Sequence, residues 1–216
     1  MPSELRLVDV VHTPAGSIAT LAVGADERQL TLSALGQPIV DRALELVRER
    51  LASGQSLDEA SRELDLSDLP RRTERLRGLG GTLLLDDTAS VAPDDVRASL
   101  RVLADLGRSG LRTVAVIGPL QVDERDRLDE HDAVGRIVVR LDIAQLVVIG
   151  AGARHLYMAA SLEGSWDGES VLFDTASTAY DFVRATTGPN TVILVSGGAH
   201  GDELAELVAR LQEDAA

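Results

Sequence analysis

The sequence predicts an α/β protein: a mostly parallel, Rossmann-like doubly wound sheet with one antiparallel strand, preceded by a small α+β segment. Two observations predict this fold class, and the chain length allows the core that it needs. From Gly81 onward, apolar runs of strand length alternate with amphipathic stretches of helix length. Only 2% of the residues are aromatic, so aliphatic side chains must fill the core, which suits buried parallel strands covered by helices. A chain of 216 residues is also long enough to bury roughly 70% of its unfolded surface.

The first 70 residues have the pattern of a small α+β segment. Two apolar runs, "LRLVDVV" and "SIATLAV", flank "HTPAG" and predict an antiparallel pair around a turn. A helix is predicted over residues 38–51, and Ser56 with Glu59 forms a capping-box pattern just beyond it. A segment of this size is marginal as an independent domain, so we expect it to lean on the rest of the chain or on a partner, and to favour self-association into a homo-oligomer.

Residues 71–87 predict a hairpin that turns at Gly80 and Gly81 and adds an antiparallel strand to the main sheet. We therefore divide the chain into residues 1–70 and residues 71–216.

Five strand–helix units follow in the second part. The first of these helices begins at Pro93, whose missing N–H is not needed there, and the next two residues are acids that favour the positive end of the helix dipole. This repetition predicts a parallel sheet with helices on both faces. The strands are expected at residues 82–87, 112–118, 145–150, 170–175 and 191–198, and the helices at 93–107, 126–141, 153–163, 176–187 and 202–212.

Composition excludes several kinds of chemistry. The chain has no Cys, which excludes disulfides, thiolate metal sites and cysteine nucleophiles. All 21 basic residues are Arg, so a Walker P-loop and Schiff-base chemistry are excluded as well, whether or not the lack of Lys merely reflects codon bias.

Charge and hydropathy restrict the partners. A net charge of -14 opposes binding to nucleic acid or an anionic membrane surface, except through a local basic patch. The densest such patch is formed by Arg71, Arg72, Arg75 and Arg77. With no apolar run of membrane-spanning length and no secretory leader pattern, we expect a cytoplasmic protein with no nucleic-acid or membrane partner.

Asp86 and Asp87 end the first predicted parallel strand, at the edge where open α/β sheets bind ligands. Two carboxylates there suit ribose hydroxyls, a magnesium ion or a phosphoryl acceptor. A receiver-type phospho-acceptor site also needs a strand-end Lys, which is absent. The structural alternative is that one Asp caps the following turn and the other faces water, and the residues alone leave both interpretations open.

Several motifs together carry a resemblance to a known family. The stretch "DDTASVAP", residues 86–93, is similar to D-D-S-Y-N-A-N-P; "RRTE" to G-R-x-E; "RTVAVIG" to R-x-x-x-V-L-G; and His131, Val134 and Gly135 to H-x-x-V-G. These are motifs of the C-terminal domain of the Mur ligase family, in the branch that adds D-alanyl-D-alanine to UDP-N-acetylmuramoyl tripeptide. Residues 1–70 resemble the end of that family's central domain.

The resemblance implies roles for particular residues. Arg72, Asp86, Asp87 and His131 become candidates for nucleotide binding. Ser196, Gly197 and His200 become candidates on the side of the incoming amino acid, because residues 196–199 occupy the place of the family's K-G-S-R motif.

Departures from the family pattern matter as much as the matches. The chain has no G-x-x-x-x-G-K-[ST] motif, Ala89, Ser90 and Ala92 replace the family's Tyr and two Asn, and both cations of K-G-S-R are missing. Electrostatic stabilisation of the transition state is usually the largest contribution to catalysis in such reactions, so loss of these cations should lower the ligation rate by several orders of magnitude. We therefore expect no catalytic residue, no metal ligand and no cofactor in the chain by itself, and a binding or regulatory role.

Two alternatives to a binding module remain. The chain is one half of a split ligase, completed by a P-loop-bearing partner that brings ATP and magnesium, or it is an unrelated doubly wound enzyme that uses Asp86 and Asp87 with magnesium.

The histidines allow ligand and structural interpretations. His131 lies in an acidic stretch that predicts a raised pKa, and a solvated helix face is favoured there over a metal site. His200 is a ligand contact or an ordinary loop residue.

Overall fold

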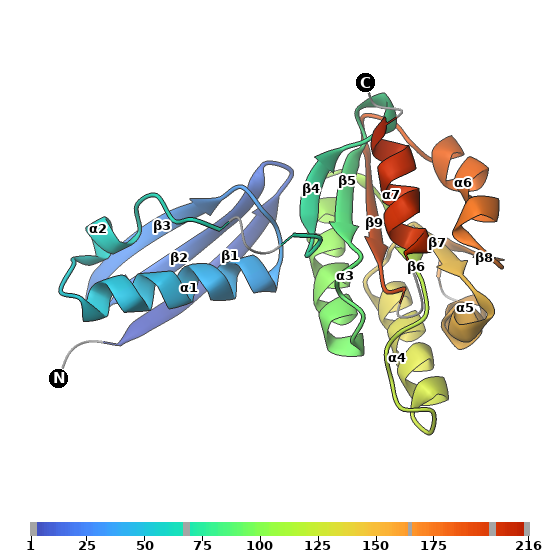
Figure 1. The fold of residues 1–216 in the computed structure, drawn as a ribbon, viewed down its shortest axis with the longest axis horizontal. Helices are drawn as coiled ribbons and strands as arrows, with labels where there is room; N and C mark the ends of the chain where they lie inside the picture. The colour runs from blue at the N-terminus through green and yellow to red at the C-terminus, as the bar shows by residue number, and fades with distance from the viewer. Residues whose placement is uncertain (1–3, 67–69, 164–165, 199–201, 214–216) are drawn as a thin grey trace. The chain divides into compact units, whose positions relative to one another are not determined.

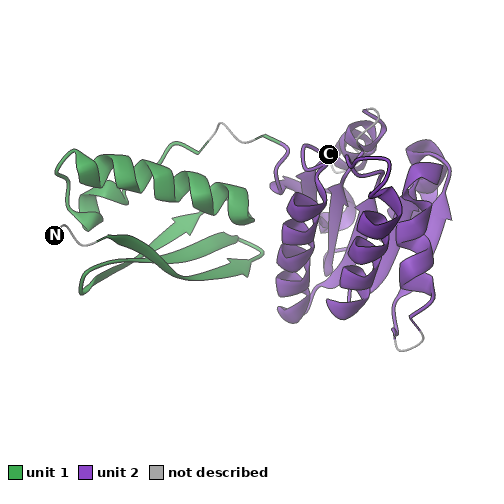
Figure 2. Ribbon diagram, turned by 90° about the horizontal axis from the view of Figure 1, so that it is seen from below, with its two compact units in different colours: residues 1–70 green, residues 71–216 purple. Residues whose placement is uncertain are grey.

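The computed structural model describes residues 4–66, 70–163, 166–198 and 202–213. It divides into two compact units, residues 1–70 and residues 71–216 (Figure 2). Each unit has its own core, and each is described by itself below. None of the described helices is long and apolar enough to cross a membrane.

Unit 1 is a three-stranded antiparallel sheet packed against one long helix. The sheet is formed by β1 (Leu5–Thr13), β2 (Gly16–Val23) and β3 (Asp26–Leu32), and the helices are α1 (Gln37–Ala52) and the short α2 (Leu57–Ala60). The predicted pair around "HTPAG" is β1 with β2, and the predicted helix is α1. The capping box is confirmed, because Glu59 N–H donates to Ser56 Oγ and Ser56 N–H donates to the Glu59 carboxylate.

The strand β3 was not predicted from the sequence. Only Leu30 and Leu32 of its seven residues are buried, while the others are exposed, so its alternating pattern is too short to be recognised. The two leucines complete a core with α1, in which Leu21, Val40 and Val47 are also buried. Burial of each large aliphatic side chain contributes about 1.5–3 kcal/mol to the stability of the fold, so this core stabilises unit 1.

Unit 2 is built on a six-stranded sheet in the order β4-β5-β9-β6-β7-β8 (Figure 1). The edge strand β4 (Glu74–Arg77) runs antiparallel to β5 (Leu83–Asp87). The other neighbours are parallel: β9 (Thr191–Ser196), β6 (Arg112–Ile117), β7 (Gln145–Ile149) and β8 (Glu169–Phe173). The predicted fold class, a mostly parallel sheet with one antiparallel strand, is therefore confirmed.

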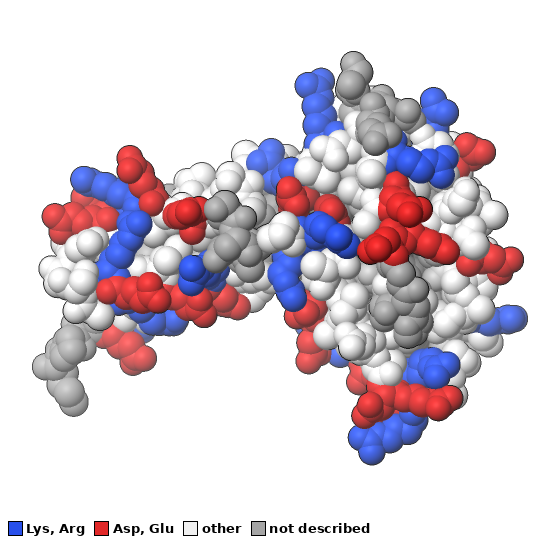
Figure 3. Space-filling view, viewed as in Figure 1, with Lys and Arg blue, Asp and Glu red and all other residues white. Residues whose placement is uncertain are grey.

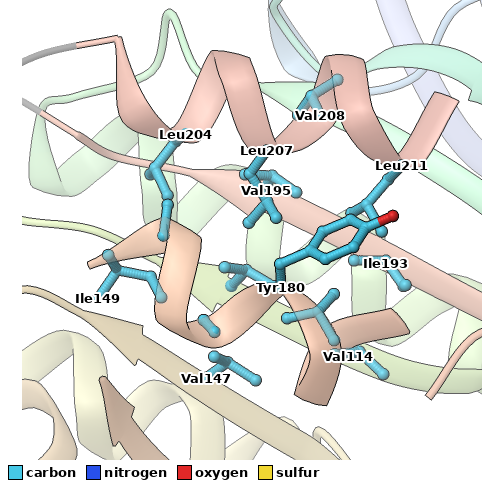
Figure 4. Packing of buried hydrophobic residues seen from close by; sticks show 14 of the residues in the cluster. Val114, Val147, Ile149, Tyr180, Ile193, Val195, Leu204, Leu207, Val208 and Leu211 are labelled. Carbon is cyan, nitrogen blue, oxygen red and sulfur yellow. The ribbon is translucent and has the colours of Figure 1, made fainter. Parts of the chain in front are cut away.

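Helices cover both faces of this sheet, also as predicted. On one face lie α6 (Ala176–Ala185) and α7 (Glu203–Glu213), whose Tyr180, Leu207 and Leu211 pack on strand residues such as Ile193 (Figure 4). The helices α3 (Pro93–Arg108), α4 (Arg127–Arg140) and α5 (Arg154–Ser161) lie on the other face (Figure 1). Because both faces are covered, the central strands β7 and β9 are buried at every position and read as continuous apolar runs.

The hairpin between β4 and β5 turns through a short 3-10 segment, Leu79–Gly81. Gly80 and Gly81 have φ values of 61° and 83°, in the left-handed region that side chains disfavour. The predicted turn at these two glycines is confirmed, and it directs β5 into the sheet so that Asp86 and Asp87 end at its carboxyl edge.

Candidate functional site

The carboxyl ends of three adjacent strands bring the candidate residues together. In the parallel register, Asp87 of β5 lies beside Ser196 of β9, and Ser196 lies beside Ile117 of β6. The strand order makes these neighbours, although 109 residues separate Asp87 from Ser196 along the chain. Ligand sites of open α/β sheets are found at this edge.

Asp87 is enclosed by hydrogen-bond donors of the protein and has no exposed surface. Its Oδ1 accepts from Thr73 N–H at 2.9 Å, from Thr73 Oγ1 at 3.1 Å and from Ser90 Oγ at 2.9 Å. Its Oδ2 accepts from Ser196 Oγ at 2.7 Å. Both carboxylate oxygens are thus already used within the protein, and neither is presented to a ligand.

Burial raises the pKa of Asp87 from its usual 3.8 to about 6, because the charged form is removed from water. The surrounding Ser and Thr hydroxyl groups oppose this shift by donating to the carboxylate, but they carry no charge. Ser196, at the position where the sequence resemblance implies a cation, contributes a neutral hydroxyl to this site.

Asp86 fixes the turn that follows β5. Its Oδ1 accepts from Thr88 N–H at 3.0 Å and from Thr88 Oγ1 at 2.7 Å, a pattern typical of an Asx turn. Asp86 is 6% exposed and Asp87 is fully buried, so neither carboxylate faces water. The sequence left open a structural interpretation in which one Asp caps the turn and the other faces water. The structure confirms the turn contact of Asp86, but the expected solvated carboxylate is wrong.

Arg72 lies in a tight turn between two residues with positive φ, Arg71 at 59° and Thr73 at 53°. Its guanidinium Nη1 is 3.4 Å from Asp95 Oδ2, in the first turn of α3, and its side chain keeps 35% of its surface exposed. A half-exposed pair of this kind is weak, because water screens the charges. Of the four nucleotide-binding candidates, Arg72 is thus the one with a substantially accessible charged group.

His131 differs from what the sequence predicts. It is 1% exposed, and it does not lie on a solvated helix face. Its Nε2 accepts from Leu120 N–H at 3.1 Å, and its Nδ1 donates to the Arg127 carbonyl at 2.7 Å, which requires the neutral imidazole. Burial lowers the pKa of His131 below 6.5, so the predicted raised pKa is wrong as well.

The buried imidazole holds the loop that leaves β6. Leu120 donates to it, and the next residue, Gln121, donates its N–H to the Val91 carbonyl at 2.8 Å. His131 therefore connects α4 to the same layer of loops as Asp87, but it supports that layer and is not presented to a ligand.

The loop after β9 is packed against the loop after β6. Gly197 has a φ of 84°, and a Cβ built on it lies 2.9 Å from the Gly118 carbonyl oxygen, closer than side chains tolerate. Gly197 N–H donates to the Ser90 carbonyl at 2.9 Å, and Gly198 N–H donates to the Pro119 carbonyl at 3.0 Å. Glycine is needed here for close approach of backbones. His200 lies outside the described residues.

A cavity of about 140 Å³ opens beside these glycines. Gly118, Gly198 and Leu204 line it, together with two carboxylate residues, Asp174 and Glu203, and among the described residues no arginine lines it. Neither acid was predicted from the sequence as a site residue. Asp174 directly follows β8 and Glu203 begins α7, so the carboxyl-end rule that selected Asp86 also applies to them.

The remaining partners of Asp87, Thr73 and Ser90, were also missed. They lie on a turn and a loop, and no sequence motif marks a hydroxyl as a partner of a distant carboxylate.

Within the described parts of the chain, no group of three or more His, Asp or Glu side chains is placed to hold a metal ion. On the face of the molecule in Figure 3, acidic and basic side chains are interspersed.

Comparison with known proteins gives a consistent result. Residues 71–199 match the family model "Mur ligase, glutamate ligase domain". The chain is 29% identical to the UDP-N-acetylmuramoyl-tripeptide–D-alanyl-D-alanine ligase of Mycobacterium leprae, over 97% of this chain and 43% of that protein. The Mycobacterium tuberculosis ligase of the same name is also 29% identical, over 82% of this chain and 38% of that protein.

Solved structures show the same fold. MurF from Acinetobacter baumannii has a TM-score of 0.76 at 21% identity, over 97% of this chain and 45% of that one. MurF ligase from Thermotoga maritima in complex with ADP has a TM-score of 0.75 at 14% identity, over 98% and 46%. The chain thus spans less than half the length of these relatives. Because the family model covers more than half of the chain, the resemblance seen in the sequence is confirmed, and the protein belongs to the Mur ligase family.

Proposed function

We propose that this chain is a Mur-ligase-like binding module of peptidoglycan precursor synthesis, acting in the cytoplasm, that does not catalyse ligation by itself. Its ligand is a nucleotide or a nucleotide-linked precursor whose phosphate groups meet Arg72. The names of its relatives support the pathway, since they are ligases that act on UDP-N-acetylmuramoyl tripeptide.

The observation that carries this proposal is the distribution of charge at the strand ends. Asp87 is occupied by four hydrogen bonds from the protein, and Asp86 by two. Ser196, Gly197 and Gly198 are held by hydrogen bonds and bring no positive charge to the edge where the family's motif has two cations. Amide-bond formation through an acyl phosphate needs such charge, because the transition state is strongly anionic.

The fit of the family's cofactors differs between the nucleotide and the metal. A phosphate group suits Arg72, whose guanidinium is accessible and only loosely paired with Asp95. Magnesium prefers carboxylate oxygens, and the two carboxylates at this edge that the sequence offered as ligands are committed to protein donors. We therefore propose weak nucleotide binding without a resident metal.

A turnover assay combined with NMR titration tests this proposal. The purified chain is given ATP, magnesium, UDP-N-acetylmuramoyl tripeptide and D-alanyl-D-alanine, and we expect no phosphate release above background. Titration with ADP is expected to shift the signals of Arg72 and its neighbours, with a dissociation constant well above micromolar. Ligation by the chain alone, or a sub-micromolar dissociation constant, contradicts the proposal.

A second candidate is the C-terminal half of a split ligase, completed by a P-loop-bearing partner that supplies the ATP and magnesium chemistry. One observation favours it: the match to solved Mur ligases extends over 97% of this chain, so it includes unit 1 as well as unit 2. Purification of the tagged chain from its native cells, with mass spectrometry, tests this candidate. Recovery of a stoichiometric partner with a Walker motif, and ATP turnover by the pair, supports it; recovery of the chain alone or as a homo-oligomer contradicts it.

A further inference from the structure

The turn that carries Arg72 is strained, and hydrogen bonds hold it at both ends. Arg71 and Thr73 both have φ values in the left-handed region, at 59° and 53°. For Thr, a β-branched residue, this conformation is a genuine outlier and persists only where surrounding contacts enforce it. Strain of this kind points to a functional constraint on the residue in between.

The enforcing contact at Thr73 comes from Asp87. The same oxygen, Oδ1, accepts from both the backbone N–H and the hydroxyl of Thr73, which is fully buried. A pair of hydrogen bonds from one residue to one oxygen fixes both the backbone and the side-chain torsion of that residue. The other carboxylate oxygen is anchored by Ser196 on β9, so the turn is tied to the middle of the sheet.

The other end of the turn is also held. Arg71 N–H donates to the Glu74 carboxylate at 3.0 Å, and the Arg71 carbonyl accepts from Ala89 N–H at 3.1 Å. Since the backbone on both sides of Arg72 is fixed, the direction in which its side chain leaves the turn is fixed as well. Among the described residues, the guanidinium of Arg72 has the weak contact with Asp95.

We infer that Asp87 is a positioning residue: as a hydrogen-bond acceptor, it holds the strained turn of Arg71 to Thr73 and so presents the Arg72 guanidinium to an anionic ligand. This inference rests on the proposed function for the identity of the ligand, a nucleotide phosphate. It assigns Asp87 a role that needs its Oδ1 acceptor and does not need its charge, which separates it from a metal ligand or a direct contact.

Protonation is consistent with this role. Burial raises the pKa of Asp87 to about 6, against the opposing effect of the surrounding Ser and Thr hydroxyl groups. Charged residues on the adjoining turn, strand and helix are Arg71, Arg72, Asp86 and Asp95. A proton on Oδ2 leaves the three bonds to Oδ1 in place, and Ser196 Oγ then has the Ser90 carbonyl, at 3.4 Å, as an alternative acceptor. The turn is therefore expected to persist on both sides of pH 6.

The experiment measures amide hydrogen exchange and ADP affinity by NMR in the same samples of the 216-residue chain. Arg72→Ala measures the full effect of losing the guanidinium, and we expect this variant to bind ADP about fivefold more weakly than the parent. Asp87→Ala is expected to match that loss and to speed exchange at Thr73 at least roughly tenfold. The matched control is Asp87→Asn, which keeps the acceptor and is expected to bind ADP within about twofold of the parent.

Two combinations sharpen the test. Arg72→Ala and Asp87→Ala together are expected to weaken ADP binding no more than Arg72→Ala alone, because Asp87 acts through Arg72. Thr73→Gly in the Asp87→Ala chain is expected to recover most of the lost affinity, since glycine adopts the positive φ without enforcement. If Asp87→Ala does not fold, Thr73→Val takes its place: it removes one bond to Oδ1, and faster exchange with weaker ADP binding supports the inference.

The outcomes that overturn the inference are distinct. Equal damage by Asp87→Asn and Asp87→Ala means that the charge itself meets the ligand. Unchanged exchange and affinity in Asp87→Ala, or in Thr73→Val as its substitute, means that the turn does not depend on the carboxylate. If instead Arg72→Ala leaves ADP binding unchanged, the proposed function fails, and the exchange rates at Thr73 alone decide whether Asp87 holds the turn.

Discussion

The interior of the parallel sheet and the layer of loops at its carboxyl edge are stabilised in different ways. In the interior, strands such as β9 are buried along their whole length by aliphatic side chains. At the edge, Asp87 and His131 are buried just as deeply, and each is held by hydrogen bonds to specific partners. Hydrophobic burial is non-directional, whereas each buried polar group needs one particular geometry. Substitutions in the interior should therefore change stability according to the side-chain volume that they remove. Substitutions at the edge should change stability according to the hydrogen bonds that they remove, and the change should depend on pH.

The largest effect is expected in the interior. Leu194, on β9, is fully buried, and Leu194→Ala removes three carbon atoms from a site covered on both sides. We expect a loss of about 3–4 kcal/mol in the free energy of unfolding, measured by denaturant titration. Leu194→Met, which conserves volume, should cost less than about 1.5 kcal/mol. A loss as large for Met as for Ala contradicts the size argument.

The next effect is pH-dependent and belongs to the edge. A carboxyl group whose pKa is raised on folding stabilises the protein most below pH 3.8, and this contribution is lost as the pH rises through about 6. Asp87→Asn cannot ionise, so its stability relative to the parent should increase by about 1.5 kcal/mol between pH 5 and pH 7.5. Urea unfolding of both chains at several pH values measures this. A constant difference across the range rules out a raised pKa.

His131 gives the opposite sign in the same layer. Its pKa is lowered, so its contribution to stability is present above pH 6.5 and is lost as the pH falls toward the folded pKa. NMR titration of the imidazole protons is expected to show a midpoint below 6.5 and the Nδ1–H tautomer. A midpoint above 6.5 contradicts the buried, neutral assignment.

The close approach of two loops at the edge predicts a steric effect on stability. Gly197→Ala places a Cβ 2.9 Å from the Gly118 carbonyl at a φ of 84°, and it should cost about 1–3 kcal/mol. Gly54→Ala is the control: its φ is similar, at 93°, but a Cβ there meets nothing within 4 Å. The difference between the two melting temperatures isolates the steric contact, and equal values would show that only the backbone conformation matters.

The smallest effect on stability is expected for Arg72→Ala. The pair with Asp95 is half-exposed, so its removal should change the free energy of unfolding by less than about 0.5 kcal/mol. Denaturant titration at low and high salt measures this. A loss above about 1 kcal/mol makes Arg72 a structural residue and removes it from the list of groups free to meet a ligand.

The fold could be predicted from the sequence because its evidence is local. Apolar runs and amphipathic stretches marked the strands and helices of unit 2, and the Gly80–Gly81 turn marked the antiparallel strand. The exception, β3, buries only two side chains, Leu30 and Leu32, so its pattern is short.

The site was less predictable because its evidence is not local. The sequence located Asp87, but the donors that enclose it come from residues 73, 90 and 196, and only the strand order places β9 beside β5. The prediction that His131 lies on a solvated helix face is wrong for a related reason. Its acidic neighbours in sequence include the exposed Asp129, whereas its own ring points inward, because consecutive residues of a helix face different directions.

The edge strand β4 has a consequence for solubility. A sheet edge offers unpaired backbone groups to other chains and can seed aggregation. Here the exposed edge is only four residues long, and Arg75 and Arg77 alternate with partly buried residues along it. Two such chains meeting edge to edge would bring these guanidinium groups together. The short hairpin that delivers Asp86 and Asp87 to the sheet thus also discourages its growth from one molecule into the next.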